Sequence, residues 1–204
     1  ESLGEYMDVE LTRAIDGRAL LAALQSTLPE GVEALDVTEV PLKHTSLMAL
    51  NVGGIYTLVF PHEPLERIAA GIEALMAADV VMVPRRQKRK DKRGREEFVM
   101  VDVNVRPMIR SLEIVPGSAP VVRATLVNSA EGKPGKPGEI LRLLTETPER
   151  ARIIKVDTLR RDGDGYASLS ADWTPPPQRE GLPAAFFTAM PAGAASEPSA
   201  AAPQ

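Results

Sequence analysis

The stretch GIYTLVFPHEPLERIAAGIEALM, residues 54–76, decides the fold. Its first seven residues are rich in β-branched and aromatic side chains, which favour a strand. Pro64 suits the first turn of a helix, because the N–H that proline lacks has no helical partner there. Apolar residues then recur at helical spacing, at Leu65, Ile68, Ala69, Ile72, Leu75 and Met76. The stretch predicts a strand followed by an amphipathic helix that packs on a sheet.

The residues downstream predict five more strands and a second helix. We expect one long hairpin from residues 80–105, and a second hairpin joined by the turn signal Pro116-Gly117. Pro137 opens the second helix. The expected strands are 80–83, 98–105, 109–115, 121–127 and 152–159, and the helix ends near 144. This order predicts an α+β fold of antiparallel sheets with helices on one face, in a ferredoxin-like unit (54–159, or 54–160 as a domain) with inserted hairpins.

The N-terminal end of the chain predicts a partial structural unit, and the C-terminal end predicts disorder. Residues 6–11 alternate apolar and polar, as a half-buried strand does, Asp16 can cap a helix, and residues 32–40 read as a return strand. We therefore expect a partial β-α-β unit at 1–40, which would be half of a second unit, and a connection at 41–53. Residues 174–204 are rich in proline and alanine, which predicts a disordered tail.

Composition excludes several kinds of site. The chain has no cysteine, which rules out disulfides, thiolate zinc sites, Cys-bound iron–sulfur clusters and a cysteine nucleophile in this chain. No apolar run approaches the roughly 20 residues of a membrane span, and no signal peptide is visible. We expect a cytoplasmic protein that binds no cofactor or metal and has no membrane partner.

The segment RRQKRKDKRGR, residues 85–95, carries most of the positive charge. Eight cations against one acid give it +7, while the whole chain is −4, so the remaining residues sum to −11. Such a run is typical of contact with a polyanion, and binding of about six phosphates on a single strand predicts a salt slope near −4. No aromatic residue lies inside the run, which favours backbone contacts over base stacking. The candidate contacts are Arg85, Arg86, Lys88, Arg89, Lys90, Lys92, Arg93 and Arg95.

Two other interpretations of this run stay open. It can be a solvated hairpin tip that protects a sheet edge from aggregation, or a nuclear-localisation signal. The loop GKPGKPG, residues 132–138, adds Lys133 and Lys136 as possible phosphate contacts before a helix. It lacks the Gly-Lys-Ser/Thr ending of a P-loop, and its two prolines lack backbone donors, so a plain loop is the alternative.

The sequence contains no recognisable catalytic constellation. His44 and His62 are the only histidines, and neither has a visible acid partner. Asp8, Glu10 and Asp102 alternate with apolar residues, as residues on the solvent-exposed face of a sheet do. Residues 162–165 (DGDG) fail the spacing of a calcium loop and predict a turn.

Four segments together resemble the radical SAM-linked protein family. They are GEYMDVEL at 4–11, VPLKHTSLMAL at 40–50, VDVNVRP at 101–107 and PGEILRLL at 137–144. Members of that family usually carry two histidine-bearing stretches before the first segment, and this sequence has neither, so a site formed by those histidines is not carried over. The family usually shows Asp-(Ile/Leu)-Arg-Pro where this chain reads DVNVRP, residues 102–107. The resemblance implies a cobalamin-binding radical SAM protein as partner.

These observations lead to one expected function and two alternatives. We expect a non-catalytic accessory protein of a radical SAM enzyme that binds or presents RNA through the cationic hairpin. Because the chain has no cysteine, the iron–sulfur cluster of such an enzyme must lie on another polypeptide. The first alternative is an RNA-processing or RNA-modifying enzyme of ferredoxin-like fold that uses His44 or Asp102. The second is a protein–protein adaptor without a nucleic-acid role.

Overall fold

The computed structural model describes residues 1–90, 94–117 and 119–169. Residues 54–76 form most of β1 (Gly53–Val59) and α3 (Leu65–Ala77), as predicted, with Pro64 as the residue just before the helix. Leu58, Phe60 and Ile68 are fully buried between them. The predicted disordered tail at 174–204 lies outside the described residues.

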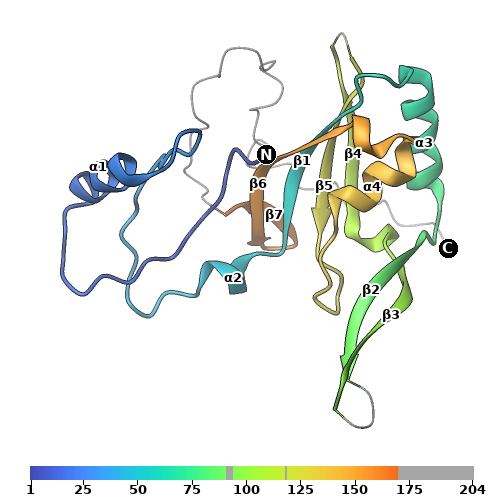
Figure 1. The fold of residues 1–204 in the computed structure, drawn as a ribbon. Helices are drawn as coiled ribbons and strands as arrows, with labels where there is room; N and C mark the ends of the chain where they lie inside the picture. The colour runs from blue at the N-terminus through green and yellow to red at the C-terminus, as the bar shows by residue number, and fades with distance from the viewer. Residues whose placement is uncertain (91–93, 118, 170–204) are drawn as a thin grey trace, which may run out of the picture.

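One antiparallel sheet of five strands forms the body of the protein (Figure 1). Its order is β4-β5-β1-β6-β7, from β4 (Ile109–Val115), β5 (Val121–Val127), β1, β6 (Arg152–Asp162) and β7 (Gly165–Ser168). β1 is central because it pairs with both β5 and β6. The backbone of β1 is therefore paired along both edges, and Ile55, Thr57 and Leu58 are buried, which suits the β-branched and apolar composition of this strand.

Two helices cover one face of this sheet. α3 and α4 (Pro137–Leu144) lie side by side against it (Figure 1). Their apolar faces meet the sheet in one cluster of Leu58, Phe60, Ile68, Leu75, Ile109, Leu112, Val122, Ala124, Leu126, Ile140, Leu141 and Leu144. The α+β class with antiparallel sheets and helices on one face is confirmed. When the separate hairpin at residues 82–104 is set aside, the element order from β1 to β6 is β1-α3-β4-β5-α4-β6, that is β-α-β-β-α-β. The finer ferredoxin-like assignment and the domain boundaries stay predictions.

Arg106 closes the C-terminal end of α3. It lies in the short 3-10 helix Arg106–Met108, and its guanidinium donates to the backbone carbonyls of Met76, Ala78 and Ile109 at 3.0–3.1 Å. The last carbonyls of a helix have no partner inside the helix, and a cation there also suits the helix dipole. Arg106 is therefore a structural residue.

The N-terminal segment, residues 4–50, differs from the prediction. α1 (Gly17–Thr27) forms, and the Asp16 carboxylate accepts from the Ala19 N–H at 3.0 Å, as expected of its cap. The strands predicted at 6–11 and 32–40 were wrong, because neither stretch is a strand. Alternation alone does not make a strand; a ladder needs a neighbouring backbone, and α1 lies apart from the sheet (Figure 1). The connection at 41–53 contains one further turn of helix, α2 (Leu47–Leu50).

In the part of the chain before β1, residues 1–3 pair with the edge of the sheet. The Leu3 N–H donates to the Lys155 carbonyl at 2.8 Å, and the Lys155 N–H donates to the Glu1 carbonyl at 3.0 Å. These bonds fill the part of the β6 edge that β7 leaves open. The predicted turn at 162–165 is confirmed, with Gly163 at φ 55°, and it leads into β7, which the sequence analysis missed.

The second sheet is a two-stranded hairpin of β2 (Met82–Lys90) and β3 (Glu96–Asn104) that projects from the body (Figure 1). The predicted hairpin is confirmed, but its cations are not confined to a loop at the tip, because residues 85–90 belong to β2 itself. Cross-strand partners explain this difference. Glu96 and Glu97 face Lys90 and Arg89 in the ladder and offset the repulsion between the cations.

Candidate nucleic-acid interface

The pairing register of β2 and β3 sorts the cationic run onto two faces. Directly opposite residues share a face, so Arg86 goes with Met100, Lys88 with Phe98, and Lys90 with Glu96. We call this the outer face; its members are Met82, Pro84, Arg86, Lys88, Lys90, Glu96, Phe98, Met100 and Asp102, all of which are exposed, and the half-buried Asn104. The inner face carries Val83, Arg85, Gln87, Arg89, Glu97, Val99, Val101 and Val103.

Arg85 is not one of the solvent-exposed cations of the hairpin. Its side chain is 6% exposed, and its guanidinium holds the Glu139 carboxylate with two bonds, Nε–Oε1 at 2.9 Å and Nη2–Oε2 at 2.7 Å. Nη2 also donates to the Pro134 carbonyl at 3.0 Å. The burial and pairing of Arg85 therefore give no support to its prediction as a phosphate contact. At the base of the hairpin the inner face packs on the body, where a lone charge would be costly, so the arginine is paired instead.

The remaining described cations lie in solvent. Arg86, Lys88, Arg89, Lys90 and Arg95 are exposed. Lys88 makes an ion pair with Glu96 at 2.6 Å, in which both side chains are about half exposed, and such a surface pair contributes little to stability. Lys92 and Arg93 lie outside the described residues. The hairpin thus brings several exposed cations together on one projecting arm.

The ladder also lowers the net charge of this arm. Residues 85–97 contain eight cations and three carboxylates, which leaves +5, and the charge of Arg85 is neutralised by Glu139 outside that segment. The net charge of +7 for residues 85–95 therefore overstates the positive electrostatic field that acts on a ligand. The arm still has a clear positive excess on a chain of net charge −4.

Phe98 is the outer-face residue that sequence reasoning undervalued. Phe98 is 57% exposed, and the guanidinium of Arg86 lies over its ring at 3.7 Å from the centroid. Arg86 is the diagonal neighbour of Phe98 across the ladder, a position that long side chains reach. Phe98 lies outside the cationic run in sequence, and only the antiparallel register brings it beside Arg86 and Lys88.

The lysines of the loop at 132–138 are arranged less favourably for phosphate. Lys133 pairs with Glu131 at 2.7 Å, and this pairing lowers the pKa of the Glu131 carboxyl. Lys136 is exposed at the start of α4. The Glu139 carboxylate already lies in the first turn of α4, where a phosphate would go. The Pro134 carbonyl accepts from Arg85, so the loop acts as a packed connection between the hairpin and the body.

Neither histidine lies in a site. His44 and His62 are both exposed. Next to His62, the Thr145 hydroxyl donates to the Glu63 carboxylate, and Thr147 does so at 3.1 Å. These bonds, that of Thr145 first, and the charge of Arg67 lower the pKa of Glu63 despite its partial burial. The cluster joins the start of α3 to the segment after α4.

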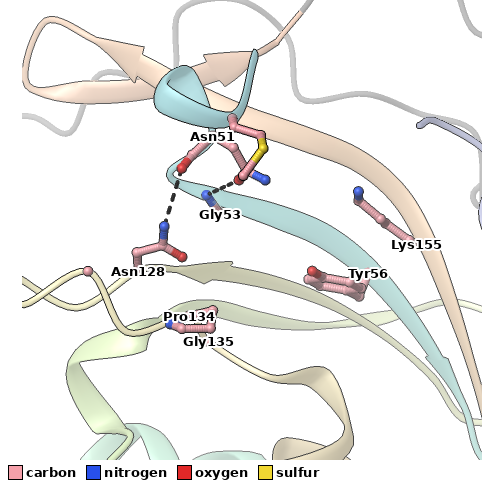
Figure 2. Close-up of a pocket in the computed structure, with 9 residues that line it drawn as sticks. Asn51, Gly53, Tyr56, Asn128, Pro134, Gly135 and Lys155 are labelled. Atoms are coloured by element: carbon pink, nitrogen blue, oxygen red, sulfur yellow. Dashed lines mark hydrogen bonds between the residues drawn. The ribbon is translucent and has the colours of Figure 1, made fainter. Parts of the chain in front are cut away.

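A shallow hollow of about 290 Å³ opens beside the loop at 132–138 (Figure 2). Tyr56 and Lys155 line one side of it, with Asn51, Asn128 and Pro134 around them. Burial raises the pKa of the Tyr56 phenol, with a smaller contribution from the negative charge of Glu5. The Lys155 ammonium is paired with Glu5 at 2.6 Å. The raised pKa keeps the proton on the Tyr56 phenol at neutral pH, and the charge of Lys155 is engaged in the ion pair with Glu5.

The described residues also contain no group of three or more His, Cys, Asp or Glu side chains suited to a metal ion. Within 1–90, 94–117 and 119–169, no helix has the length and apolar character needed to cross a membrane.

Comparison with known proteins gives one match. No curated protein and no solved structure matches the chain. The family described as an uncharacterized protein conserved in bacteria (DUF2344) matches residues 1–137, a region that includes the hairpin β2–β3 and most of the sheet up to the start of α4. With about two thirds of its length matched, this chain belongs to DUF2344.

Proposed function

We propose that this protein is a non-catalytic accessory protein that binds RNA with the outer face and tip of the hairpin β2–β3. The observation that carries the proposal is the row Arg86, Lys88 and Lys90, which are exposed at alternate positions of one strand. Alternate residues of a strand are about 6.6 Å apart on one face, so each cation can meet a different phosphate. An arm that projects from an acidic body presents these charges to a long polyanion.

The binding has a defined ionic signature. With Arg85 engaged by Glu139, seven members of the cationic run remain as proposed contacts, namely Arg86, Lys88, Arg89, Lys90, Lys92, Arg93 and Arg95, of which Lys92 and Arg93 lie outside the described residues. Contact of about five of them with a single strand predicts that log K falls with log salt at a slope near −3.5. This value is smaller than the one expected from the run alone, because one of its members is buried.

A radical SAM enzyme is the proposed partner of this accessory protein. Support for it comes from the resemblance of residues 4–11, 40–50, 101–107 and 137–144 to the radical SAM-linked family. Because this chain has no cysteine, the proposal assigns the iron–sulfur cluster to the partner. The exposed positions of His44 and Asp102 lend no support to the alternative of an RNA-processing enzyme.

The test is fluorescence anisotropy with a labelled oligouridylate at several salt concentrations. We expect the quadruple variant Lys88→Gln, Arg89→Gln, Lys90→Gln and Arg95→Gln to lose most of the affinity and to flatten the salt slope. The matched control neutralises four exposed cations outside the hairpin, Arg13, Arg18, Arg142 and Arg150, and should bind like the wild type. Absence of binding by the wild type in dilute buffer, or equal losses in both variants, would contradict the proposal.

A specific observation favours a second function, that of a protein–protein adaptor. The N-terminal segment exposes many large apolar side chains, namely Met7, Val9, Leu11, Ile15, Val32, Leu35, Val40, Leu42 and Met48. An apolar surface of this extent is typical of a protein contact. Its test is co-elution with a purified radical SAM protein. Replacement of Leu42 and Met48 by serine should abolish co-elution, while the quadruple hairpin variant should keep it; the reverse pattern would contradict the adaptor function.

A further inference from the structure

The outer face of the hairpin carries an aromatic feature that phosphate binding alone does not explain. Phe98 is 57% exposed, and its neighbour Met100 is 64% exposed. A face that served only to attract phosphate would need no large apolar group in water. The guanidinium of Arg86 stacks on the Phe98 ring at 3.7 Å from its centroid, and Lys88 lies directly opposite. A flat aromatic surface and two cations therefore occupy adjoining positions.

This juxtaposition has a known chemical use. Bases of single-stranded nucleic acid stack on exposed aromatic rings and on arginine planes, while nearby cations hold the sugar–phosphate backbone. A strand is a suitable support, because its side chains stand perpendicular to the sheet and the pairing fixes their spacing. Bases of a duplex are already stacked on one another, so a duplex could use the cations of this face but not the ring.

We propose that the ligand of the hairpin is single-stranded RNA, with one base stacked on Phe98 and the Arg86 guanidinium, and with the adjoining phosphates held by Lys88 and Lys90. This inference rests on the proposed function and narrows it to one class of nucleic acid. It makes Phe98 the residue that gives the hairpin its preference for binding single strands over duplexes. It also gives Arg86 two tasks, since its guanidinium stacks over the Phe98 ring, where a base can add to the stack, and its charge attracts the RNA backbone.

The test compares three RNA probes of equal length: an oligouridylate, the same backbone with abasic sites, and a duplex. Phe98→Leu should weaken binding of the oligouridylate about tenfold, leave its salt slope unchanged, and leave the abasic and duplex probes unaffected. Phe98→Tyr keeps the ring and should bind all three probes like the wild type. Because Phe98 is exposed, we expect both variants to unfold at the wild-type urea midpoint, which checks that the hairpin is intact.

A fluorescence signal gives a second measurement. Trp173 is the one tryptophan of the chain and lies outside the described residues, so Phe98→Trp combined with Trp173→Phe provides a reporter in the ladder. The oligouridylate should quench this reporter, and the abasic probe should not.

The outcomes distinguish the two proposals. Equal losses on all three probes with Phe98→Leu, no loss at all, or tighter wild-type binding of the duplex would overturn the stacking inference and leave cationic RNA binding standing. Failure of the wild type to bind any probe in dilute buffer would overturn both.

Discussion

The guanidinium of Arg85 and the carboxylate of Glu139 form a buried two-bond pair, with Nη2 and Oε2 2.7 Å apart. Arg85 lies on β2 and Glu139 in the first turn of α4, so the pair joins the hairpin to the helical layer. Both side chains are less than a tenth exposed. The third bond, to the Pro134 carbonyl, includes the loop at 132–138 in the same junction. The hairpin therefore has a defined attachment to the body.

The first prediction concerns this pair. Arg85→Met should lower the free energy of unfolding by about 3–5 kcal/mol, because it leaves the Glu139 carboxylate buried and uncompensated. Adding Glu139→Met should restore most of the loss, since an apolar pair needs no charge compensation. Urea denaturation measures both. Lys88→Met, which removes the half-exposed pair with Glu96, should cost about 0–1 kcal/mol. A single variant as stable as the wild type would show that the pair does not hold the hairpin.

The second prediction concerns pH. The hydrogen bond from Thr145 lowers the folded-state pKa of Glu63 below its ordinary value of 4.5, with further lowering from Thr147 and Arg67. A lowered folded pKa means that the ionised carboxylate stabilises the fold at neutral pH. This stabilisation is lost as the pH falls below about 4.5 and through the folded pKa.

When the pH falls from about 7 to about 3, the free energy of unfolding of Glu63→Gln should therefore decrease less than that of the wild type. Urea denaturation at the two pH values measures this difference. Glu73, an exposed carboxylate of α3, supplies the control: Glu73→Gln should lose as much as the wild type. If the Glu63 variant follows the wild-type pH dependence, the threonine cluster does not stabilise the carboxylate.

The third prediction concerns the C-terminal end of α3. Arg106→Ala removes three charge-assisted hydrogen bonds to backbone carbonyls and should destabilise the protein by about 2–4 kcal/mol. Arg110, an exposed residue of β4, is the matched control, and Arg110→Ala should stay within about 0.5 kcal/mol of the wild type. Thermal unfolding separates the two variants, and equal midpoints would refute the capping role.

The fourth prediction concerns the loop at 132–138. A Cβ at Gly135 would lie 3.0 Å from the Leu126 Cβ and 3.0 Å from the Val127 carbonyl oxygen. Gly135→Ala should therefore cost about 1–3 kcal/mol, as overpacking against a strand does. At Gly117 the nearest atom is 3.9 Å from an added Cβ, so Gly117→Ala should be close to neutral in the same denaturation assay. Equal stability of the two variants would mean that the loop does not pack tightly on β5.

Local pattern determined most of the elements of the body. The periodicity of residues 54–76 predicted β1 and α3, the turn signal at 116–117 predicted the β4–β5 hairpin, and Pro137 predicted the start of α4. Each of these signals comes from residues that are close together in the sequence. The apolar positions of each pattern also match the side of the element that is buried. The N-terminal segment shows where this reasoning fails: residues 6–11 alternate like a strand, but strand formation depends on a partner backbone that the pattern does not contain.

The sequence by itself determined that the protein carries a dense cationic run, an α+β order of elements and no thiol chemistry. Tertiary structure alone decided what each cation does. The two-residue period of β2 turned Arg85 inward to Glu139 and turned Arg86, Lys88 and Lys90 outward. The antiparallel register then brought Phe98 beside them. The physical reason is that charge and periodicity are properties of one segment, whereas burial, pairing and stacking depend on which distant segment lies opposite.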